Sequence, residues 1–201
     1  MRVDELMRYT QAFYPNWDQA YADRLREEFQ LPERGRIKSL SRGETAKAGL
    51  LIALAHRPDL LLLDEPSSGL DPIARKDILA AVVRSVAEEG RTVVFSSHLL
   101  DEVERVADHV AMLHDGAVTL DAPLDDIKAA HRRYVVRWPD ALLERPNLPG
   151  ILRVVGEDRE WEILCVGDEV LFIEAVHAAG GEVLEASIPA LETIFVARAS
   201  A

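Results

Sequence analysis

The feature that most constrains the fold is a run of four leucines, Leu60–Leu63, with Asp59 before it and Asp64 and Glu65 after it. A short, uninterrupted apolar run bounded by charges is typical of a strand buried on both faces, as in a parallel sheet. A second short strand is expected from Thr92 in "TVVFSS". The segment between them opens with Asp-Pro, an N-cap followed by proline at the first helical position. Strand, helix and strand in this order predict an α/β layer with a right-handed crossover.

Residues 1 to about 38 are predicted to be mainly helical, with aromatic residues for packing and Pro15 as an interruption. Ser41 opens a further helix that Pro58 ends, and Glu44 three residues later completes a capping-box pattern. Two interpretations of this helix start stay open. The pattern is a cap alone, or the first-turn amides and Gly43 form an anion site at the positive end of the helix.

Downstream, a short helix is expected over Leu99 to Ala107, and Asp115-Gly116 predicts a hairpin turn. The last part, with "RYVVRW", "WEILCV", a helix from Glu169 to Ala179 and "IPALETIFVA" as its closing segment, indicates a small α+β appendage. The predicted division is therefore a helical subdomain over residues 1–58, an α/β core over 59–122 and the appendage over 123–201.

Composition limits the function. A formal net charge of -12 argues against a nucleic-acid-binding surface, which needs clustered Lys and Arg. Cys165 is the only cysteine, so no intrachain disulfide can form. The most apolar window, Ala48 to Leu63, is interrupted by charged residues and proline and is too short to span a bilayer. We therefore expect that any work at a membrane is done through another chain.

The chemistry is expected where the two strands end. Asp64 and Glu65 follow the first strand and His98 follows the second, at the edge where open α/β sheets bind ligands. One carboxylate can hold a hydrated Mg²⁺ and the next can polarise a water, which suits hydrolysis at a metal-bound phosphate. The alternatives are that the acidic pair only turns the chain and that His98 is an ordinary surface histidine.

Two longer stretches, "LSRGETAKAGLLIALAHRPDLLLLDEPSSGLDP" and "VVFSSHLLDEVERVADHVAMLHDG", closely resemble the ATP-binding subunits of ABC transporters. The resemblance covers about Tyr9 to Leu120. It identifies Leu40–Glu44 with the signature motif, Leu60–Asp64 with the Walker B strand and Ser68–Asp71 with the D-loop. The fold that it implies is a P-loop NTPase-like α/β sheet, incomplete in this chain, with a helical subdomain.

The resemblance also implies roles and ligands. Asp64 would help to bind Mg²⁺, Glu65 would be the catalytic glutamate that orients or deprotonates water, and His98 would sense the γ-phosphate of ATP. Two subunits of this family sandwich ATP between them. Hydrolysis would then drive export or import through a membrane permease, with this chain on the cytoplasmic face of the membrane.

Residues of the signature and the D-loop would act across that subunit interface. Ser41, Gly43 and Glu44 would contact the nucleotide of the second ATPase subunit, and Asp71 would couple the two sites. The signature departs from the family pattern, since Arg42 stands where a first glycine is usual and Glu44 where glutamine is usual.

A larger departure is that none of the eleven glycines is followed by lysine, so the chain has no G-x-x-x-x-G-K-[ST] loop. The family places that loop, and strands that flank the Walker B strand, upstream of where this sequence begins. The leading interpretation is a C-terminal part of an ABC ATPase, inactive alone. The alternatives are a complete, non-catalytic partner that offers its signature motif to a full-length ATPase, and a relic without function.

Overall fold

The computed structural model describes residues 1–87, 90–141 and 144–200. Contacts divide the chain into two compact units, Met1–Leu99 and Leu100–Ala201. The first unit therefore holds both the expected helical subdomain and the two expected strands. The division into three segments at residues 58 and 122 stays a prediction, because compactness groups residues by contact and not by role.

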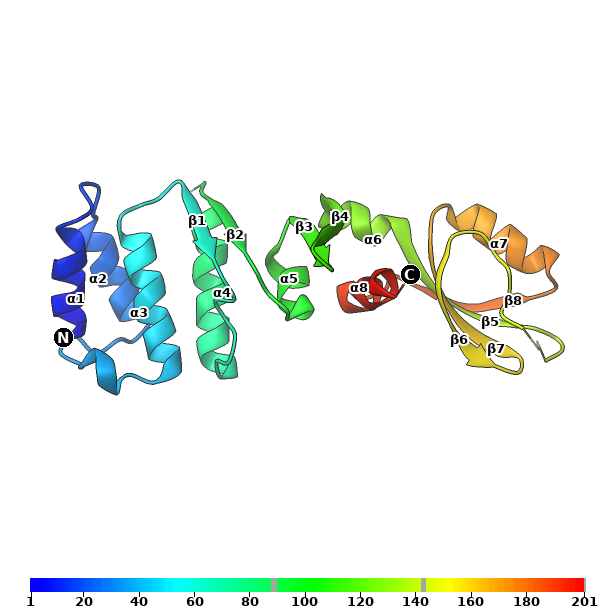
Figure 1. Ribbon diagram of the computed structural model, residues 1–201, viewed down its shortest axis with the longest axis horizontal. Coiled ribbons are helices and arrows are strands. Elements are labelled where there is room, and N and C mark those ends of the chain that lie inside the picture. Colours follow the sequence, from blue (N-terminus) through cyan, green and yellow to red (C-terminus); the bar gives the residue numbers. More distant parts are fainter. Residues whose placement is uncertain (88–89, 142–143, 201) are drawn as a thin grey trace. The chain divides into compact units, whose positions relative to one another are not determined.

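The first unit places a layer of helices against a small parallel sheet (Figure 1). Its elements are α1 (Val3–Gln11), α2 (Gln19–Glu28), a 3-10 turn η1 (Ile37–Ser39), α3 (Arg42–Ala55), β1 (Leu60–Leu63), α4 (Pro72–Ala87) and β2 (Thr92–Phe95). The expected helix–strand–helix–strand order after Ser41 is confirmed. β1 pairs with β2 in parallel from Leu60↔Thr92 to Leu63↔Phe95.

Local sequence signals explain where these helices begin. The side chain of Asp18 caps α2 by accepting a hydrogen bond from the backbone N–H of Tyr21 at 2.9 Å. The same carboxylate accepts from Arg57, whose guanidinium Nη2 lies 2.9 Å away at the far end of α3. The Tyr21 amide, with the Arg57 guanidinium as a smaller cause, holds the pKa of Asp18 below its usual value. One acidic residue thus joins the start of α2 to the end of α3.

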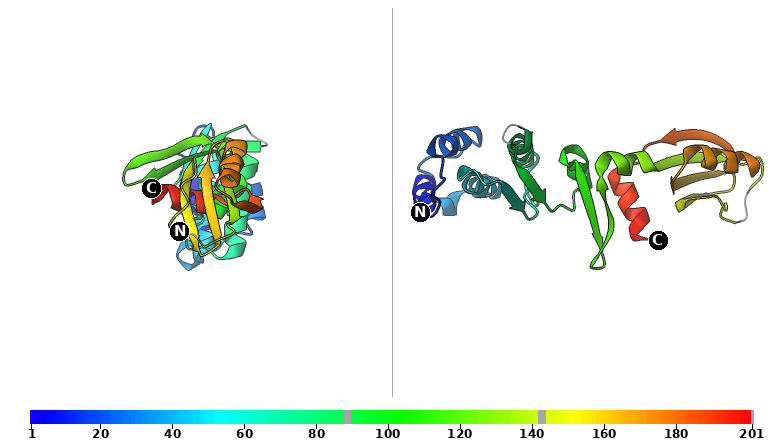
Figure 2. Two further views of the ribbon diagram at one scale, coloured as in Figure 1. Left: turned by 90° about the vertical axis from the view of Figure 1, so that its right-hand side faces the viewer. Right: turned by 90° about the horizontal axis from the view of Figure 1, so that it is seen from above.

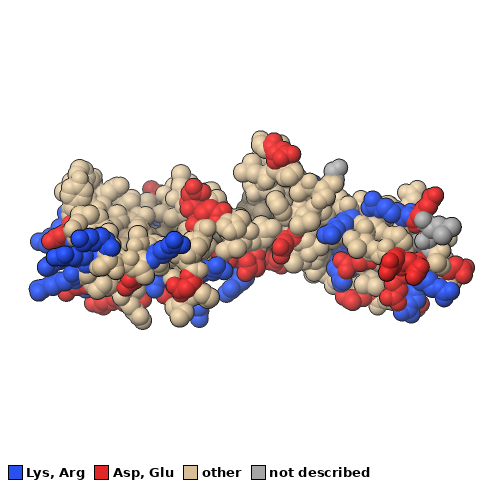
Figure 3. Space-filling model, turned by 60° about the horizontal axis from the view of Figure 1, so that its bottom comes forward, with Lys and Arg blue, Asp and Glu red and all other residues tan. Residues whose placement is uncertain are grey.

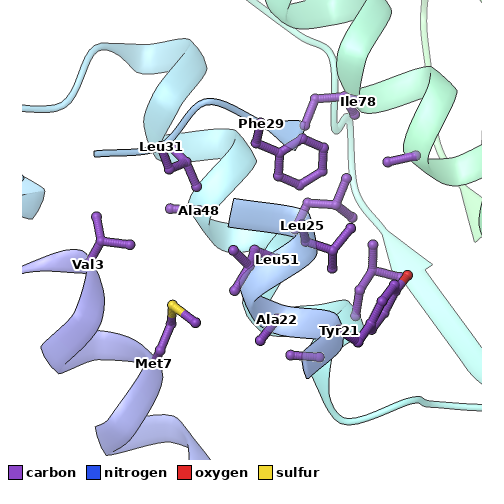
Figure 4. Close-up of a cluster of buried hydrophobic side chains, with 14 of the residues drawn as sticks. Val3, Met7, Tyr21, Ala22, Leu25, Phe29, Leu31, Ala48, Leu51 and Ile78 are labelled. Carbon is purple, nitrogen blue, oxygen red and sulfur yellow. The ribbon is translucent and has the colours of Figure 1, made fainter. Parts of the chain in front are cut away.

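Helices α1, α2 and α3 pack around one apolar core, which Figure 4 shows in close-up. Val3 and Met7 of α1, Ala22 and Leu25 of α2, and Leu51 of α3 all belong to it. Each of these side chains is buried. The exposed aromatic residues Tyr9, Phe13 and Tyr14 take no part in this core.

The β1–β2 sheet is covered on one face only. Leu61 is 4% exposed and packs in the core with Ile78 of α4, whereas Leu62 is 70% exposed on the opposite face. Leu60 and Val94 are exposed beside it. The prediction that β1 is buried on both faces is therefore wrong, because the described residues supply two strands and helices on a single side. Leu60 and Leu62 are therefore exposed, while Leu61 between them is buried.

The second unit contains two antiparallel sheets. Its elements are α5 (Leu100–Val106), β3 (His109–His114), β4 (Ala117–Pro123), α6 (Leu124–Ala130), β5 (His131–Arg137), β6 (Ile151–Glu157), β7 (Glu160–Val166), α7 (Glu169–Ala178), β8 (Glu182–Ser187) and α8 (Leu191–Ala199). β3 and β4 form the hairpin that Asp115-Gly116 predicts, and the other four strands are ordered β6-β7-β5-β8.

The closing segment, α8, packs on the β3–β4 hairpin, and Figure 2 shows the two side by side. At its start, the backbone N–H of Leu191 donates to Glu104 of α5 at 2.8 Å. Near its end, Arg198 donates to Nε2 of the buried His131 at 3.2 Å. The other ring nitrogen of His131, Nδ1, lies 2.7 Å from the carbonyl of Ile127. Polar contacts at both ends therefore hold α8 in place.

Candidate functional site

The carboxyl ends of β1 and β2 bring the predicted catalytic residues together around one hydroxyl group. Ser96, directly after β2, donates from Oγ to Asp64 Oδ1 at 2.7 Å. The same oxygen accepts a hydrogen bond from the backbone N–H of Glu65 at 2.8 Å. Parallel pairing places these positions side by side, since Leu63 is opposite Phe95. Ser96 therefore orients both adjacent carboxylate residues at once.

His98 completes this cluster. Its Nδ1 lies 2.6 Å from Glu65 Oε2, so the two predicted catalytic side chains are in direct contact. An ionised carboxylate can only accept hydrogen bonds, so Nδ1 is the nitrogen that carries hydrogen in this pair. The His98 side chain is 62% exposed, so the ring is open to solvent or to a ligand. The pairing holds Glu65 and His98 in one orientation while both stay accessible.

Glu65 has an unusual backbone conformation, with φ of 47°. The left-handed region is unfavourable for a residue with a Cβ, and such strain concentrates at functional sites because surrounding contacts must maintain it. Here the hydrogen bond from the Glu65 amide to Ser96 is one of those contacts. The turn aims the Glu65 side chain toward His98 rather than along the strand direction.

The acidic pair suits a magnesium ion that is shared with a substrate. No group of three or more His, Cys, Asp or Glu that could hold a metal occurs in the part of the chain that the structure describes. Mg²⁺ usually needs only one or two protein carboxylates and completes its shell with phosphate oxygens and water. Asp64 has one oxygen bonded to Ser96 and a second that can face a metal. The donor set therefore fits Mg²⁺ bound together with a phosphate.

The capping box at the start of α3 is formed as predicted. The backbone N–H of Glu44 donates to Ser41 Oγ at 3.1 Å, and the backbone N–H of Ser41 donates to Glu44 Oε2 at 2.7 Å. The hydrogen bonds from Ser41, chiefly that from its backbone, lower the pKa of the Glu44 carboxyl. Each of the two side chains named for nucleotide contact is thus bonded to the backbone N–H of the other residue, and an anion site at this helix start stays a prediction.

Gly43 has a packing reason that the sequence did not reveal. A Cβ at this position would lie 2.7 Å from the Cβ of Ala74 and 3.4 Å from Oδ2 of Asp71. The start of α3 thus presses directly on the start of α4. The sequence predicts the approach of an anion at Gly43, whereas the close approach in the structure is that of helix α4.

Asp71 is the N-cap of α4. Its Oδ1 accepts hydrogen bonds from the backbone N–H groups of Ile73 and Ala74, both at 3.0 Å. These bonds, first that from Ala74, lower the pKa of Asp71. Because Gly43 and Asp71 are neighbours, the predicted signature and D-loop residues form a second cluster. The described residues show no hydrogen bond between this cluster and the Ser96 cluster.

A cleft of about 600 Å³ connects the surroundings of the two clusters. Its lining includes Arg42 and Thr45 of α3 and, from the segment after β1, Asp64, Glu65 and Ser68. Arg42, which departs from the family pattern, therefore contributes a cation to the cleft that holds the acidic pair. A ligand with anionic and metal-binding groups would suit both the Arg42 cation and the acidic pair.

Ser96 is a site residue that the sequence alone did not predict. The available signal was a hydroxyl residue directly after the second strand and two positions before His98, in "FSSHLL". Side chains at that point of a parallel strand lie beside those at the end of its neighbour. Nothing in the spacing distinguishes Ser96 from Ser97, whose hydroxyl instead accepts a hydrogen bond from the backbone of Leu99.

Several known proteins are similar to parts of this chain. Residues 24–103 match the family described as "AAA domain, putative AbiEii toxin, Type IV TA system". The ABC transporter ATP-binding protein YtrB of Bacillus subtilis is 34% identical over 124 residues, which cover 62% of this chain and 42% of that protein. An uncharacterized ABC transporter ATP-binding protein of Alkalihalophilus pseudofirmus is 32% identical over 169 residues, covering 82% and 63%.

A solved structure, described as the ATP binding subunit of an ABC transporter, has 29% sequence identity and a TM-score of 0.56. The match covers 64% of this chain and 55% of that one. It confirms the mixed α/β fold with a small parallel sheet and antiparallel sheets. The chain spans roughly half the length of the proteins that it matches, from 42% to 63%.

Proposed function

Because the chain is a homologue of ABC transporter ATP-binding proteins over part of its length, we propose that it carries the hydrolytic and signature elements of such a subunit. The reaction is hydrolysis of ATP, with Mg²⁺, and it powers transport through a membrane permease. The observation that carries the proposal is the network in which Ser96 holds Asp64 and Glu65 while His98 contacts Glu65.

The side chains of this network divide the work. Mg²⁺ supplies charge stabilisation at the transferred phosphoryl group. Asp64, whose Oδ1 is held by Ser96, would bind the metal through its carboxylate. Glu65 orients a water molecule and accepts its proton, for which a carboxylate held at one oxygen by His98 remains available at the other. His98 would donate from Nε2 to the γ-phosphate, which requires hydrogen on both ring nitrogens because Nδ1 already donates to Glu65.

The second cluster acts on the nucleotide of a partner subunit. The positive end of the α3 dipole lies at Ser41, and Arg42 adds a full charge beside it. Ser41, Gly43 and Glu44 form the face offered to the γ-phosphate of the second ATPase subunit. Asp71 couples that face to α4. Its Oδ1 caps α4, and its Oδ2 would lie 3.4 Å from a Cβ placed on Gly43.

Partners and location follow from the same proposal. A permease supplies the membrane-spanning part, and no helix among the described residues is long and apolar enough to cross a membrane. The chain then sits on the cytoplasmic face of the membrane, attached through the permease and a second ATPase subunit. Nucleic acid is not a partner, given the net charge of -12.

A second candidate is a non-catalytic partner that offers its signature helix to a full-length ATPase. The observation in its favour is that the printed chain has no G-x-x-x-x-G-K-[ST] loop to grip the phosphates. Both candidates predict no significant ATPase activity for this chain alone. They differ in whether Glu65 is needed for ATP hydrolysis after a phosphate loop has been added to the chain.

The deciding experiment extends the chain with the phosphate-loop segment of a relative and compares Glu65→Gln with Asp59→Asn. The two variants make the same charge change at opposite ends of β1. We expect Glu65→Gln to abolish turnover and spare ATP binding, and Asp59→Asn to keep both. Near-normal turnover in Glu65→Gln would remove Glu65 from the catalytic role. If the extended chain binds no ATP and stimulates a full-length ATPase in a Ser41-dependent manner, the non-catalytic candidate replaces the first.

A further inference from the structure

The loop before η1 is fixed against the start of α1 by backbone hydrogen bonds. The N–H of Val3 donates to the carbonyl of Gly35 at 3.1 Å, and the N–H of Asp4 donates to Glu33 at 3.2 Å. Arg2 and Arg36 form an antiparallel bridge between the two segments. Their positions are therefore set by main-chain contacts that do not depend on their own side chains.

A depression of about 770 Å³ lies beside this bridge. It is lined by Met1, Arg2, Glu5, Arg36, Ile37 and Lys38. Its one carboxylate already accepts a hydrogen bond from the backbone N–H of Arg2 at 2.8 Å. Over the described ranges, the side chains of Arg2, Arg36 and Lys38 form no ion pair with a carboxylate. Three cations thus converge on a hollow that contains one acidic group.

This concentration of positive charge is unusual for the chain. Ten of its 23 Lys and Arg residues fall within the first 58 positions, although the net charge of the whole chain is -12. Figure 3 shows Lys and Arg gathered at the end of the first unit that contains the N-terminus. Like charges placed directly opposite each other on paired segments are destabilising, so Arg2 and Arg36 carry an electrostatic cost in the free protein. A bound anion would remove that cost.

We propose that this depression is a binding site for a phosphate-bearing anion. Guanidinium groups bind phosphate oxygens through paired, charge-assisted hydrogen bonds, and Lys38 adds a compact positive charge. The phosphate belongs either to a free polyphosphate or to the headgroup of an anionic lipid, which present the same chemistry. The site lies outside the Ser96 cluster and performs no hydrolysis. If the depression bound no anion, the proposed ATPase function would be unaffected.

The test measures binding of inorganic pyrophosphate to the purified chain by calorimetry, with Arg36→Gln as the disrupting variant and Arg34→Gln as the control. Arg34 belongs to the same loop, and Arg34→Gln removes the same charge, but Arg34 does not line the depression. We expect Arg36→Gln to weaken binding by about tenfold or more, the value of one charge-assisted contact. Arg34→Gln should change it by less than about twofold, because exposed charges outside the site are screened.

A second arm identifies the source of the phosphate. Vesicles of phosphatidylcholine with phosphatidylglycerol are compared with vesicles of phosphatidylcholine alone by cosedimentation. Arg36-dependent binding to the anionic vesicles assigns the site to lipid headgroups, and Arg36-dependent binding to pyrophosphate alone assigns it to a free phosphate. The proposal is overturned if the wild-type chain binds neither probe, or if Arg34→Gln and Arg36→Gln weaken binding equally. Circular dichroism of both variants confirms that the exposed substitutions leave the helices intact.

Discussion

The contact between the starts of α3 and α4 makes a specific prediction for Gly43. Replacing Gly43 by alanine would put a methyl carbon 2.7 Å from the Cβ of Ala74, well inside normal contact distance. Both atoms belong to rigid helical backbones, so neither can rotate away. The helices must separate, and the separation would also disturb the ion pair between Lys47 and Asp77, which joins the same two helices at 2.7 Å.

Two opposing contributions determine how much Gly43→Ala changes the free energy of unfolding. Overpacking a close-packed contact costs about 1–3 kcal/mol. Alanine is favoured over glycine by about 1 kcal/mol in a helix interior, and by less at the first turn, where Gly43 stands. The packing cost is the larger, so we expect Gly43→Ala to lower the free energy of unfolding by about 1–2 kcal/mol.

Gly49, on the same helix, is the matched control. A Cβ added there meets nothing within 4 Å, so only the helix propensity changes. Gly49→Ala should raise the free energy of unfolding by about 0.5–1 kcal/mol. The same Gly-to-Ala substitution is therefore expected to destabilise the protein at position 43 and to stabilise it at position 49, because only position 43 has a close neighbour.

Urea denaturation followed by circular dichroism measures both variants. The double variant Gly43→Ala with Ala74→Gly removes the second methyl group and should recover part of the loss, which isolates the coupling between the two positions. If Gly43→Ala is as stable as the wild type, or if Ala74→Gly gives no recovery, the close approach of the two helices is wrong.

Two further predictions concern the second unit. Burial, and secondarily the positive charge of Arg198, lowers the pKa of His131 below 6.5, so the neutral form is favoured by folding. Stability is therefore complete above pH 6.5 and falls as the pH drops below it, and urea denaturation across this range should show a loss that His131→Asn does not show. Tyr134 stacks on Phe172 with ring centres 4.5 Å apart, but its buried hydroxyl has no hydrogen-bond partner among the described residues. Tyr134→Phe should therefore raise the melting temperature, by an amount equivalent to about 1 kcal/mol, and a lower melting temperature would mean that the hydroxyl is satisfied.

Local signals in the sequence predicted local structure well. The Ser41–Glu44 box, the Asp71-Pro72 helix start and the Asp115-Gly116 hairpin all appear where expected, because each depends on hydrogen bonds or backbone angles within a few residues. The placement of the acidic pair and His98 at one sheet edge also followed from the strand order, since parallel strands end on the same side.

The features that the sequence did not predict depend on contacts between segments that are far apart in the chain. Ser96 and Asp64 are 32 positions apart, and only the register of β1 on β2 brings them together. Gly43 and Ala74 meet through the packing of two helices, which no periodicity in either helix specifies. The exposure of Leu62 depends on what packs against the open face of β1. These features are set by tertiary structure, which local patterns in one sequence do not determine.

The half-covered β1–β2 sheet also affects how the chain behaves at high concentration. Each of its two strands has one edge whose backbone groups lack a strand partner among the described residues, and Leu60, Leu62 and Val94 form an apolar strip between those edges. Such a surface is a template on which extended segments of other molecules can add as further strands. The strip thus favours aggregation at high concentration, because alternate leucines of β1 face the core and the open side of the sheet.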